Sequence, residues 1–206
     1  MKRGINTKCI HLEDEEGCFD NYGSLSYPIY QTATYAHPAV GESTGYDYSR
    51  LQNPTREHLE KIVAALEDGI DAIALSSGMA AITLLMEIFK PGDHVIVDSD
   101  LYGGSIRLFS NVSEKNNITF SCVDCHKEKV EDYITENTKA IYIETPTNPM
   151  MNVTDIEAMA KVAHERDLLL IVDNTFMSPY FQNPLKLGAD IVIHSGTKYL
   201  GGHNDT

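Results

Sequence analysis

The sequence is poor in positive charge: its 206 residues include 16 lysines and arginines against 30 aspartates and glutamates, a formal net charge of −14. A surface this acidic repels phosphate backbones and anionic lipids, which argues against nucleic acid or a membrane as a partner. Long apolar runs are missing too. The longest, such as 168–172, have five residues, far fewer than a membrane span needs.

The sequence also shows no secretion signal and few cysteines. Its N-terminal residues lack the apolar core of a signal peptide, so we expect a cytoplasmic protein with reduced thiols. The four cysteines are Cys9, Cys18, Cys122 and Cys125. The Cys122-x-x-Cys125-His motif matches the short pattern for covalent haem attachment, but no export signal or second ligand pair accompanies it. We therefore expect no haem and no metal, and the alternating segment that ends at Cys122 predicts a core residue there.

Residues 1 to about 50 differ in composition from the rest of the sequence. Glycine, tyrosine, serine and aspartate are frequent there, and apolar residues show no sustained period. Such a segment has too few apolar positions to fold by itself. The sequence is therefore predicted to divide into an extended arm, residues 1–52, and a core domain, residues 53–206.

From residue 53 onward, helical and strand-like segments alternate. Apolar residues in 55–67 share one helical face, and Gly69 follows as a stop signal. A second helix is expected over 78–90. A third is expected over 154–166, where Thr154 and Glu157 form a capping box. That helix is expected to bury Ile156, Met159, Ala160 and Ala163. Strands are expected at 72–75, 94–97, 118–122, 140–143, 168–172 and 191–193.

Most of these strand segments are too apolar to alternate, as expected of strands buried on both faces of a parallel sheet. Strands separated by helices at this spacing form right-handed βαβ units. The predicted fold class is therefore α/β, with an open, mostly parallel sheet and helices on both faces. Such sheets bind ligands at the carboxyl ends of their strands, so the residues that follow each strand are candidates for a site.

Polar residues and glycines follow five of the expected strands and would converge on that edge. Ser77, Gly78 and Met79 lead from a strand into a helix, where free N–H groups favour a phosphate; the alternative is an ordinary tight turn. Asp173 ends a buried strand, and a buried charge needs a cationic partner. Lys198 follows the last strand and is either a Schiff-base nucleophile or a surface lysine. An amine, a carboxylate, an aromatic ring and a phosphate cup are the set that pyridoxal 5′-phosphate (PLP) requires.

Six motifs resemble those of the PLP-dependent trans-sulfuration enzymes of cysteine and methionine metabolism. They begin at Tyr46, Ser76, Leu101, Glu144, Asp173 and Ser195, and they read YDYSRLQNPT, SSGMA, LYGG, ETPTNP, DNTF and SGTKY. The family includes cystathionine γ-synthase, γ-lyase and β-lyase, methionine γ-lyase and O-acetylhomoserine sulfhydrylase. The resemblance runs from about residue 32 to residue 206 and implies the aspartate-aminotransferase-like fold of a large PLP-binding domain.

The resemblance implies a role for each matching residue. Lys198 resembles the lysine that binds PLP as a Schiff base and transfers protons, Asp173 the carboxylate that keeps the pyridine nitrogen protonated, and Tyr102 the ring that stacks on the cofactor. These three are the expected catalytic residues. The other expected cofactor contacts in the core domain are Ser77, Gly78, Met79, Ser195 and Thr197 around the phosphate, Asn148 near the phenolic oxygen and Thr175 beside Asp173.

The resemblance also implies partners and a reaction. In the family, the residues that match Tyr48 and Arg50 reach the phosphate of the neighbouring subunit. The active unit would be a homodimer, usually doubled to a homotetramer, with the arm of residues 1–52 contacting the partner. The substrate would be a small amino acid that loses a substituent from its γ-carbon. A thiol then adds in a synthase, whereas water releases an oxo-acid and ammonia in a lyase.

Within the family, the residues favour one branch. Gly104 stands where methionine γ-lyases carry a reactive cysteine, and the segments 102–107 and 176–180 look more like the cystathionine γ-synthase and γ-lyase branch. Cystathionine γ-synthase, which replaces the γ-substituent with cysteine, is the favoured activity. Cystathionine γ-lyase, cystathionine β-lyase and O-acetylhomoserine sulfhydrylase stay open.

The sequence departs from the family pattern in its length. It has no counterpart of the smaller C-terminal domain or of the arginine that grips the substrate carboxylate. It also lacks the strand that, in the family, lies between the strands expected at 72–75 and 191–193, and this loss leaves unpaired edges. The alternative of another class is a truncated, catalytically silent fragment, and we expect the 206-residue chain alone to be inactive.

Overall fold

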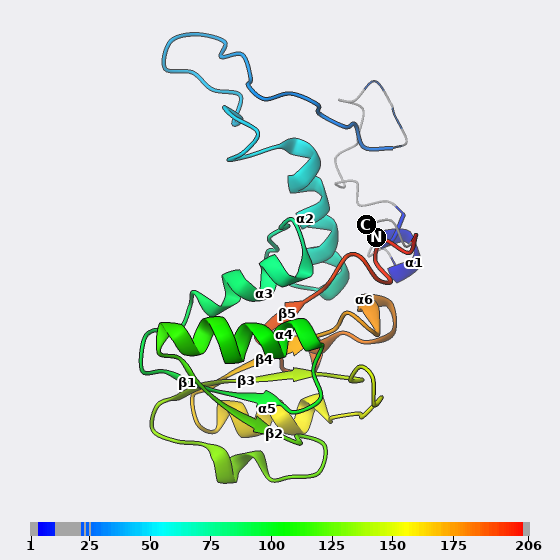
Figure 1. Cartoon of the computed structure of the whole chain (residues 1–206). Coiled ribbons are helices and arrows are strands. Elements are labelled where there is room, and N and C mark those ends of the chain that lie inside the picture. Colours follow the sequence, from blue (N-terminus) through cyan, green and yellow to red (C-terminus); the bar gives the residue numbers. More distant parts are fainter. Residues whose placement is uncertain (1–3, 11–21, 23, 25, 204–206) are drawn as a thin grey trace. The chain divides into compact units, whose positions relative to one another are not determined.

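The structure, a computed structural model, describes residues 4–10, 22, 24 and 26–203 (Figure 1). The chain forms two compact units, Met1–Ala74 and Leu75–Thr206, and each is described by itself. Cys18 lies outside the described residues. In the part of the chain that the structure describes, no helix is long and apolar enough to cross a membrane. The division into an arm of residues 1–52 and a core domain stays a prediction.

The main helix of the N-terminal unit, α2 (Pro54–Glu67), is the helix expected over 55–67. The side chain of Asn53 caps it by accepting a hydrogen bond from the N–H of Thr55 at 2.9 Å. Its end differs from the prediction, because Asp68 and not Gly69 takes the left-handed conformation, with φ of 56°. The N–H of Gly69 then donates to the Ala64 carbonyl at 2.8 Å, which closes the last turn.

The rest of the N-terminal unit has little regular structure among its described residues. A short helix, α1 (Ile5–Lys8), is tied to α2 by Lys8, whose Nζ donates to the Ala65 carbonyl at 2.8 Å. Residues 26–52 contain one isolated antiparallel bridge, between Thr34 and Tyr48, and no helix or strand.

The C-terminal unit is built on a five-stranded parallel sheet. Its strands are β1 (His94–Asp98), β2 (Thr119–Val123), β3 (Thr138–Glu144), β4 (Leu169–Asp173) and β5 (Ile191–Ile193). They lie in the order β2-β1-β3-β4-β5, and every neighbouring pair is parallel. The residues of β1 are all buried, and those of β3 and β4 almost all. Continuous apolar runs therefore lie in the middle of the sheet, as the sequence predicted.

Helices cover both faces of this sheet, so the predicted α/β class is confirmed (Figure 1). One core cluster contains residues of α3 (Gly78–Met86) and α4 (Gly103–Leu108), and the other contains residues of α5 (Ile156–His164). Alternate residues of the strands supply the two clusters: Val95 and Val97 face the first, and Ile96 faces the second. Short elements complete the unit: η1 (Phe109–Ser113), η2 (Glu114–Asn116), η3 (Val130–Tyr133), α6 (Ser178–Phe181) and η4 (Pro184–Leu187).

The strand expected at 72–75 does not form. No described strand offers this segment a backbone partner, and strand geometry depends on such a partner because each N–H and C=O needs a hydrogen bond. Its side chains are correspondingly open to solvent, with Ile73 at 69% exposure and Leu75 at 41%.

Two helices of the C-terminal unit also differ in their ends from the prediction. The helix expected over 154–166 is α5, and the expected capping box is wrong, because Asp155 caps it by accepting from the N–H of Ala158 at 3.0 Å. The N–H of Thr154 instead donates to Thr145 Oγ1 at 3.0 Å. The expected buried face of α5 is confirmed residue by residue. The helix expected over 78–90 ends at Met86.

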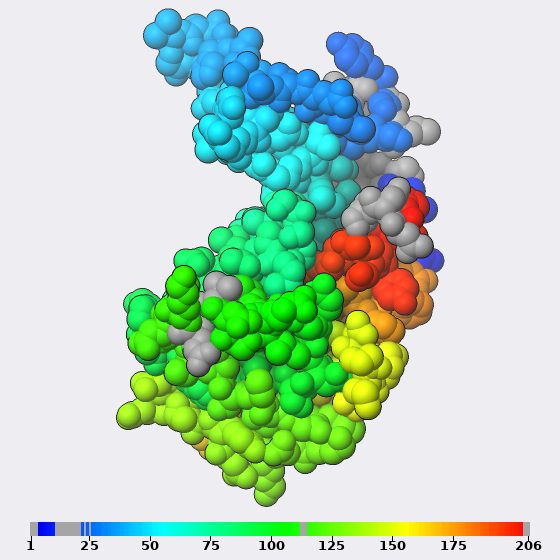
Figure 2. Space-filling view, in the orientation of Figure 1, coloured from blue at the N-terminus to red at the C-terminus, as the bar shows by residue number. Residues whose placement is uncertain are grey.

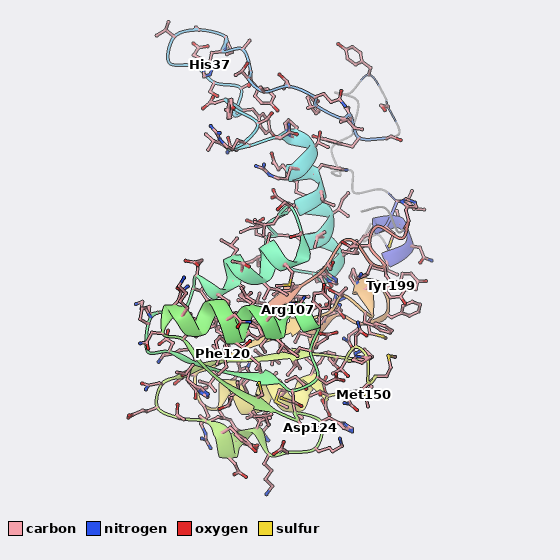
Figure 3. All side chains as sticks on the ribbon, viewed as in Figure 1. His37, Arg107, Phe120, Asp124, Met150 and Tyr199 are labelled. Atoms are coloured by element: carbon pink, nitrogen blue, oxygen red, sulfur yellow. The ribbon has the colours of Figure 1, made fainter. Side chains whose placement is uncertain are left out.

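The expected burial of Cys122 is wrong, because its side chain is exposed and that of Cys125 is buried. Strand β2 lies at the edge of the sheet, where fewer neighbours cover it. Phe120, on the same face as Cys122, stacks on Phe109 with ring centroids 5.0 Å apart. Figure 3 labels Phe120. Burial raises the pKa of the Cys125 thiol, which keeps it protonated and unreactive.

Candidate active site

Three neighbouring strands of the sheet, β1, β3 and β4, each end in a buried carboxylate. Asp98, Glu144 and Asp173 are 3%, 6% and 7% exposed. Loss of hydration disfavours a buried negative charge, and burial is the main cause of the raised pKa of all three. The pKa of Asp98 rises to about 6 and that of Glu144 to about 7. Such a concentration of buried acids is rare in a structural core and marks this edge as a candidate site.

Hydrogen bonds fix the Asp173 carboxylate in one orientation. The N–H of Thr175 donates to Oδ1 at 3.0 Å, and the hydroxyl of Tyr142 donates to Oδ2 at 3.4 Å. Both contacts favour the charged form and lower the pKa, but burial raises it by more. Thr175 Oγ1 in turn accepts from the N–H of Ser195 at 2.8 Å. The structure therefore connects three predicted site residues, Asp173, Thr175 and Ser195, through direct hydrogen bonds.

The turn that begins α3 lies against Ser195. Ser77 caps the helix by accepting from the N–H of Ala80 at 3.1 Å. Gly78 approaches so closely that a Cβ added there would lie 2.8 Å from the Cβ of Ser195. The first N–H groups of a helix have no partner within it. The start of α3 therefore presents backbone donors from one side, and Ser195 presents its hydroxyl from the other. That arrangement suits a phosphate group.

Tyr102 lies beside the same turn, at the start of α4. Its ring and the sulfur of Met79 both cover Gly104, where an added Cβ would lie 2.8 Å from Met79 Sδ and would collide with the Tyr102 ring. The N–H of Tyr102 donates to Glu144 Oε2 at 2.8 Å. Tyr102 is 46% exposed, so part of its side chain is available to a ligand at this edge.

Lys198 and Thr197 lie in the turns that follow β5, and both are exposed. The N–H of Lys198 donates to the Ser195 carbonyl at 3.2 Å, and its own carbonyl accepts from the N–H of Gly202 at 2.8 Å. Asn148, also exposed, lies in the loop after β3. In the space-filling view this loop, coloured yellow, lies at the surface (Figure 2). Figure 3 labels Met150 in the same loop and Tyr199 next to Lys198.

Tyr48 and Arg50 belong to the N-terminal unit, whereas the other predicted site residues belong to the C-terminal unit. The Arg50 guanidinium carbon lies 4.8 Å from the centroid of the Tyr48 ring, a cation–π contact. The two side chains therefore form a pair within their own unit.

Sequence reasoning missed the residues that support this site. These residues are Glu144, which lies in the ETPTNP motif, Asp100 and Tyr142. The signal was present in the strand ends, because an acidic residue that directly continues a buried apolar run is costly unless it has partners. The partners themselves, such as Tyr142 for Asp173, come from neighbouring strands.

Comparison with known proteins decides the family. Residues 6–206 match the family of Cys/Met metabolism PLP-dependent enzymes. The chain belongs to this family. It is 56% identical to a Bacillus subtilis protein named cystathionine gamma-synthase/O-acetylhomoserine (thiol)-lyase, over 100% of this chain and 55% of that protein. The resemblance drawn from the motifs is thereby confirmed.

Solved structures of this family share the fold. The crystal structure of MetB from Corynebacterium glutamicum matches with a TM-score of 0.93 and 47% identity, over 99% of this chain and 53% of that one. Cystathionine gamma-lyase from Lactobacillus plantarum, complexed with L-serine, matches with a TM-score of 0.92 and 47% identity. The chain therefore has the PLP-binding large-domain fold, and it spans about half the length of these relatives.

The residues at the sheet edge fit PLP, the cofactor of this family. The start of α3, where Gly78 and Ser195 approach each other closely, suits a phosphate group. The buried Asp173 carboxylate suits a pyridinium nitrogen as its partner, because a cation beside a buried acid offsets the acid's loss of hydration. The exposed ring of Tyr102 can stack on a flat heterocycle.

Proposed function

We propose that the whole protein is a cytoplasmic PLP-dependent trans-sulfuration enzyme that acts at the γ-carbon of homoserine-derived or cystathionine-type amino acids. Its activity is cystathionine γ-synthase, which replaces the γ-substituent with cysteine. The observation that carries the proposal is the hydrogen-bonded connection from the buried Asp173 carboxylate through Thr175 to Ser195, which lies against Gly78 at the start of α3. This connection joins a site for a pyridinium nitrogen to a site for a phosphate.

The residues of the C-terminal unit divide the work of holding the cofactor. Asp173 pairs with the ring nitrogen, Thr175 lies beside it, Tyr102 stacks on the ring and Asn148 contacts the phenolic oxygen. Ser77, Gly78, Met79, Ser195 and Thr197 surround the phosphate, and Lys198 forms the covalent link. When bound, PLP supplies an electron sink that stabilises negative charge at the substrate's α-carbon.

The chain's own groups then hold and move protons. Burial favours the neutral form of the Asp173 carboxyl, and a protonated ring nitrogen beside it favours the charged form. The carboxylate therefore holds a proton on that nitrogen. Once the Lys198 amine no longer holds the cofactor, it removes the proton from the α-carbon of the substrate, and Tyr102 assists the transfer.

The active unit in this proposal is a homodimer, doubled to a homotetramer. Tyr48 and Arg50 reach the phosphate held by the neighbouring subunit, with the arm of residues 1–52 against that subunit. A guanidinium suits this task because its planar fork binds two phosphate oxygens at once. The contact between Arg50 and the Tyr48 ring supports the proposal, since it orients the guanidinium before a phosphate is met.

The test is turnover by the whole protein loaded with PLP. We expect O-succinylhomoserine and cysteine to give cystathionine, and a Lys198→Ala variant to give none. Release of cysteine, an oxo-acid and ammonia from cystathionine would instead assign a γ-lyase, release of homocysteine and pyruvate a β-lyase, and use of O-acetylhomoserine with sulfide a sulfhydrylase. No turnover of any of these substrates would overturn the proposal. The 206-residue chain by itself is expected to show none of these reactions.

A further inference from the structure

Two loops at the carboxyl edge of the sheet are held together by hydrogen bonds from their backbone N–H groups to two carboxylates. The first loop follows β1 and contains Asp100 and Tyr102; the second follows β3 and contains Asn148. Glu144, at the end of β3, accepts a hydrogen bond from the N–H of Tyr102 at 2.8 Å. Asp100 accepts from the N–H of Met150 at 3.2 Å. The end of β3 therefore holds the backbone of the first loop through Glu144, and the first loop holds the backbone of the second through Asp100.

A side-chain contact strengthens the second connection. The hydroxyl of Thr147, which is fully buried, donates to the same Asp100 oxygen that binds the N–H of Met150. Asn148 lies between these two donors in the sequence. Asp100 therefore holds the side chain of Thr147 on one side of Asn148 and the backbone of Met150 on the other.

The second loop is also closed on itself, which makes it rigid. The N–H of Thr147 donates to the Asn152 carbonyl at 2.9 Å, and the N–H of Asn152 donates back to Thr147 Oγ1 at 3.0 Å. The N–H of Met151 donates to the Thr147 carbonyl at 3.1 Å. A closed loop of this kind moves as one piece, so its attachment to Asp100 fixes the whole of it relative to Tyr102.

We propose that Asp100 and Glu144 are positioning residues that hold the loop of Tyr102 and the loop of Asn148 at a fixed separation, and so set the geometry around the cofactor ring. The inference rests on the proposed function, in which Tyr102 stacks on the ring and Asn148 contacts its phenolic oxygen. Neither carboxylate needs to touch the cofactor. The effect follows because misplacement of a reacting group by about 1 Å can cost about a hundredfold in rate.

The test compares Asp100→Ala and Glu144→Ala in the whole protein loaded with PLP. We expect kcat to fall by about ten- to a hundredfold with a smaller change in KM, because geometry at the ring and not substrate binding is altered. The visible circular dichroism of bound PLP should weaken, since it reports how asymmetrically the ring is held. Asp100→Asn and Glu144→Gln keep one acceptor oxygen and should lose only about two- to tenfold in kcat.

Asp190→Ala is the matched control. The Asp190 carboxylate also accepts a hydrogen bond from a backbone N–H, that of Leu170, at 2.8 Å. Leu170, however, lies at the start of the buried part of β4, away from the carboxyl edge. We expect Asp190→Ala to lower the free energy of unfolding and to leave kcat and the dichroism per bound PLP unchanged.

Unchanged kcat and dichroism in the Asp100 and Glu144 alanine variants would overturn this inference alone. If the alanine variants do not fold, the same result in Asp100→Asn and Glu144→Gln would overturn it. A wild-type protein that neither binds PLP nor turns over substrate would overturn the proposed function, and this inference with it.

Discussion

Glu144 and Asp173 are direct partners in the parallel register of β3 and β4, so that two adjacent strands end in buried carboxylates side by side. Each carboxylate binds a backbone N–H of the loop that follows a strand: Tyr102 for Glu144 and Thr175 for Asp173. The charge of Asp173 contributes to the raised pKa of Glu144, after burial. Two like charges this close are mutually unfavourable, so a cation bound beside Asp173 would stabilise the pair.

The first prediction concerns the covalent attachment of the cofactor. Borohydride reduction of the PLP-loaded protein should fix the cofactor on Lys198, because that lysine follows the strand beside Asp173 and is tied by its backbone to Ser195. Peptide mapping by mass spectrometry measures the site. Lys198→Ala should carry no label. A label on Lys186 or Lys139 in the wild-type protein would refute the assignment.

The second prediction concerns the two aspartates of the sheet region. Asp173→Ala should lower kcat by about a hundredfold or more, since it removes the carboxylate that holds the ring-nitrogen proton. Asp190→Ala should have little effect on kcat, because that carboxylate binds the N–H of Leu170 at 2.8 Å and contacts His164. Steady-state kinetics on both variants measure the difference, and equal losses would contradict the role given to Asp173.

The third prediction concerns sharing of the site between subunits. Arg50→Ala and Lys198→Ala proteins should each be inactive, and mixing them should restore activity, because a mixed dimer has one site with both residues intact. Random exchange gives about a quarter of the wild-type activity. Asp173→Ala mixed with Lys198→Ala is the control, since both residues serve the same half of the site, and it should restore nothing. No recovery with Arg50→Ala, once subunit exchange is shown, would count against a shared site.

The fourth prediction concerns the close approach of α3 to Ser195. Gly78→Ala should weaken PLP binding by roughly tenfold and lower the free energy of unfolding by about 1–3 kcal/mol, because the new Cβ would lie 2.8 Å from the Ser195 Cβ. Gly103 is a matched control at the same position of α4, where the nearest contact of an added Cβ is 3.7 Å, with Arg107. A PLP affinity in Gly78→Ala equal to that of Gly103→Ala would contradict the prediction.

The fifth prediction concerns the pH dependence of stability. Burial raises the folded-state pKa of Asp98 from 3.8 to about 6, so the folded protein holds this proton more tightly than the unfolded chain. The Asp98 contribution to stability is therefore present at low pH and is lost as pH rises from about 4 to about 6. Asp98→Asn cannot titrate, and its free energy of unfolding relative to wild type should rise by up to about 3 kcal/mol across this range. Urea unfolding at several pH values measures it, and a constant difference would contradict it.

The sequence by itself determined the fold class, the five strands that form and the edge at which a site would lie. Those features depend on local patterns: apolar runs such as 168–172 stay strands because both their faces are buried. The family was also determined at this level, because motifs such as SGTKY and ETPTNP specify it through residue identity alone. That Asp173 ends a strand at the carboxyl edge follows from the same patterns.

Only the tertiary structure decided the features that depend on a distant partner. The segment 72–75 has strand composition but no neighbouring strand to pair with, and Cys122 is exposed because β2 lies at the edge of the sheet. The connections of Glu144 to Tyr102 and of Asp100 to Met150 join residues 42 and 50 positions apart. Local periodicity carries no information on such contacts, because a hydrogen bond between two loops is specified by the register of the strands that bring them together.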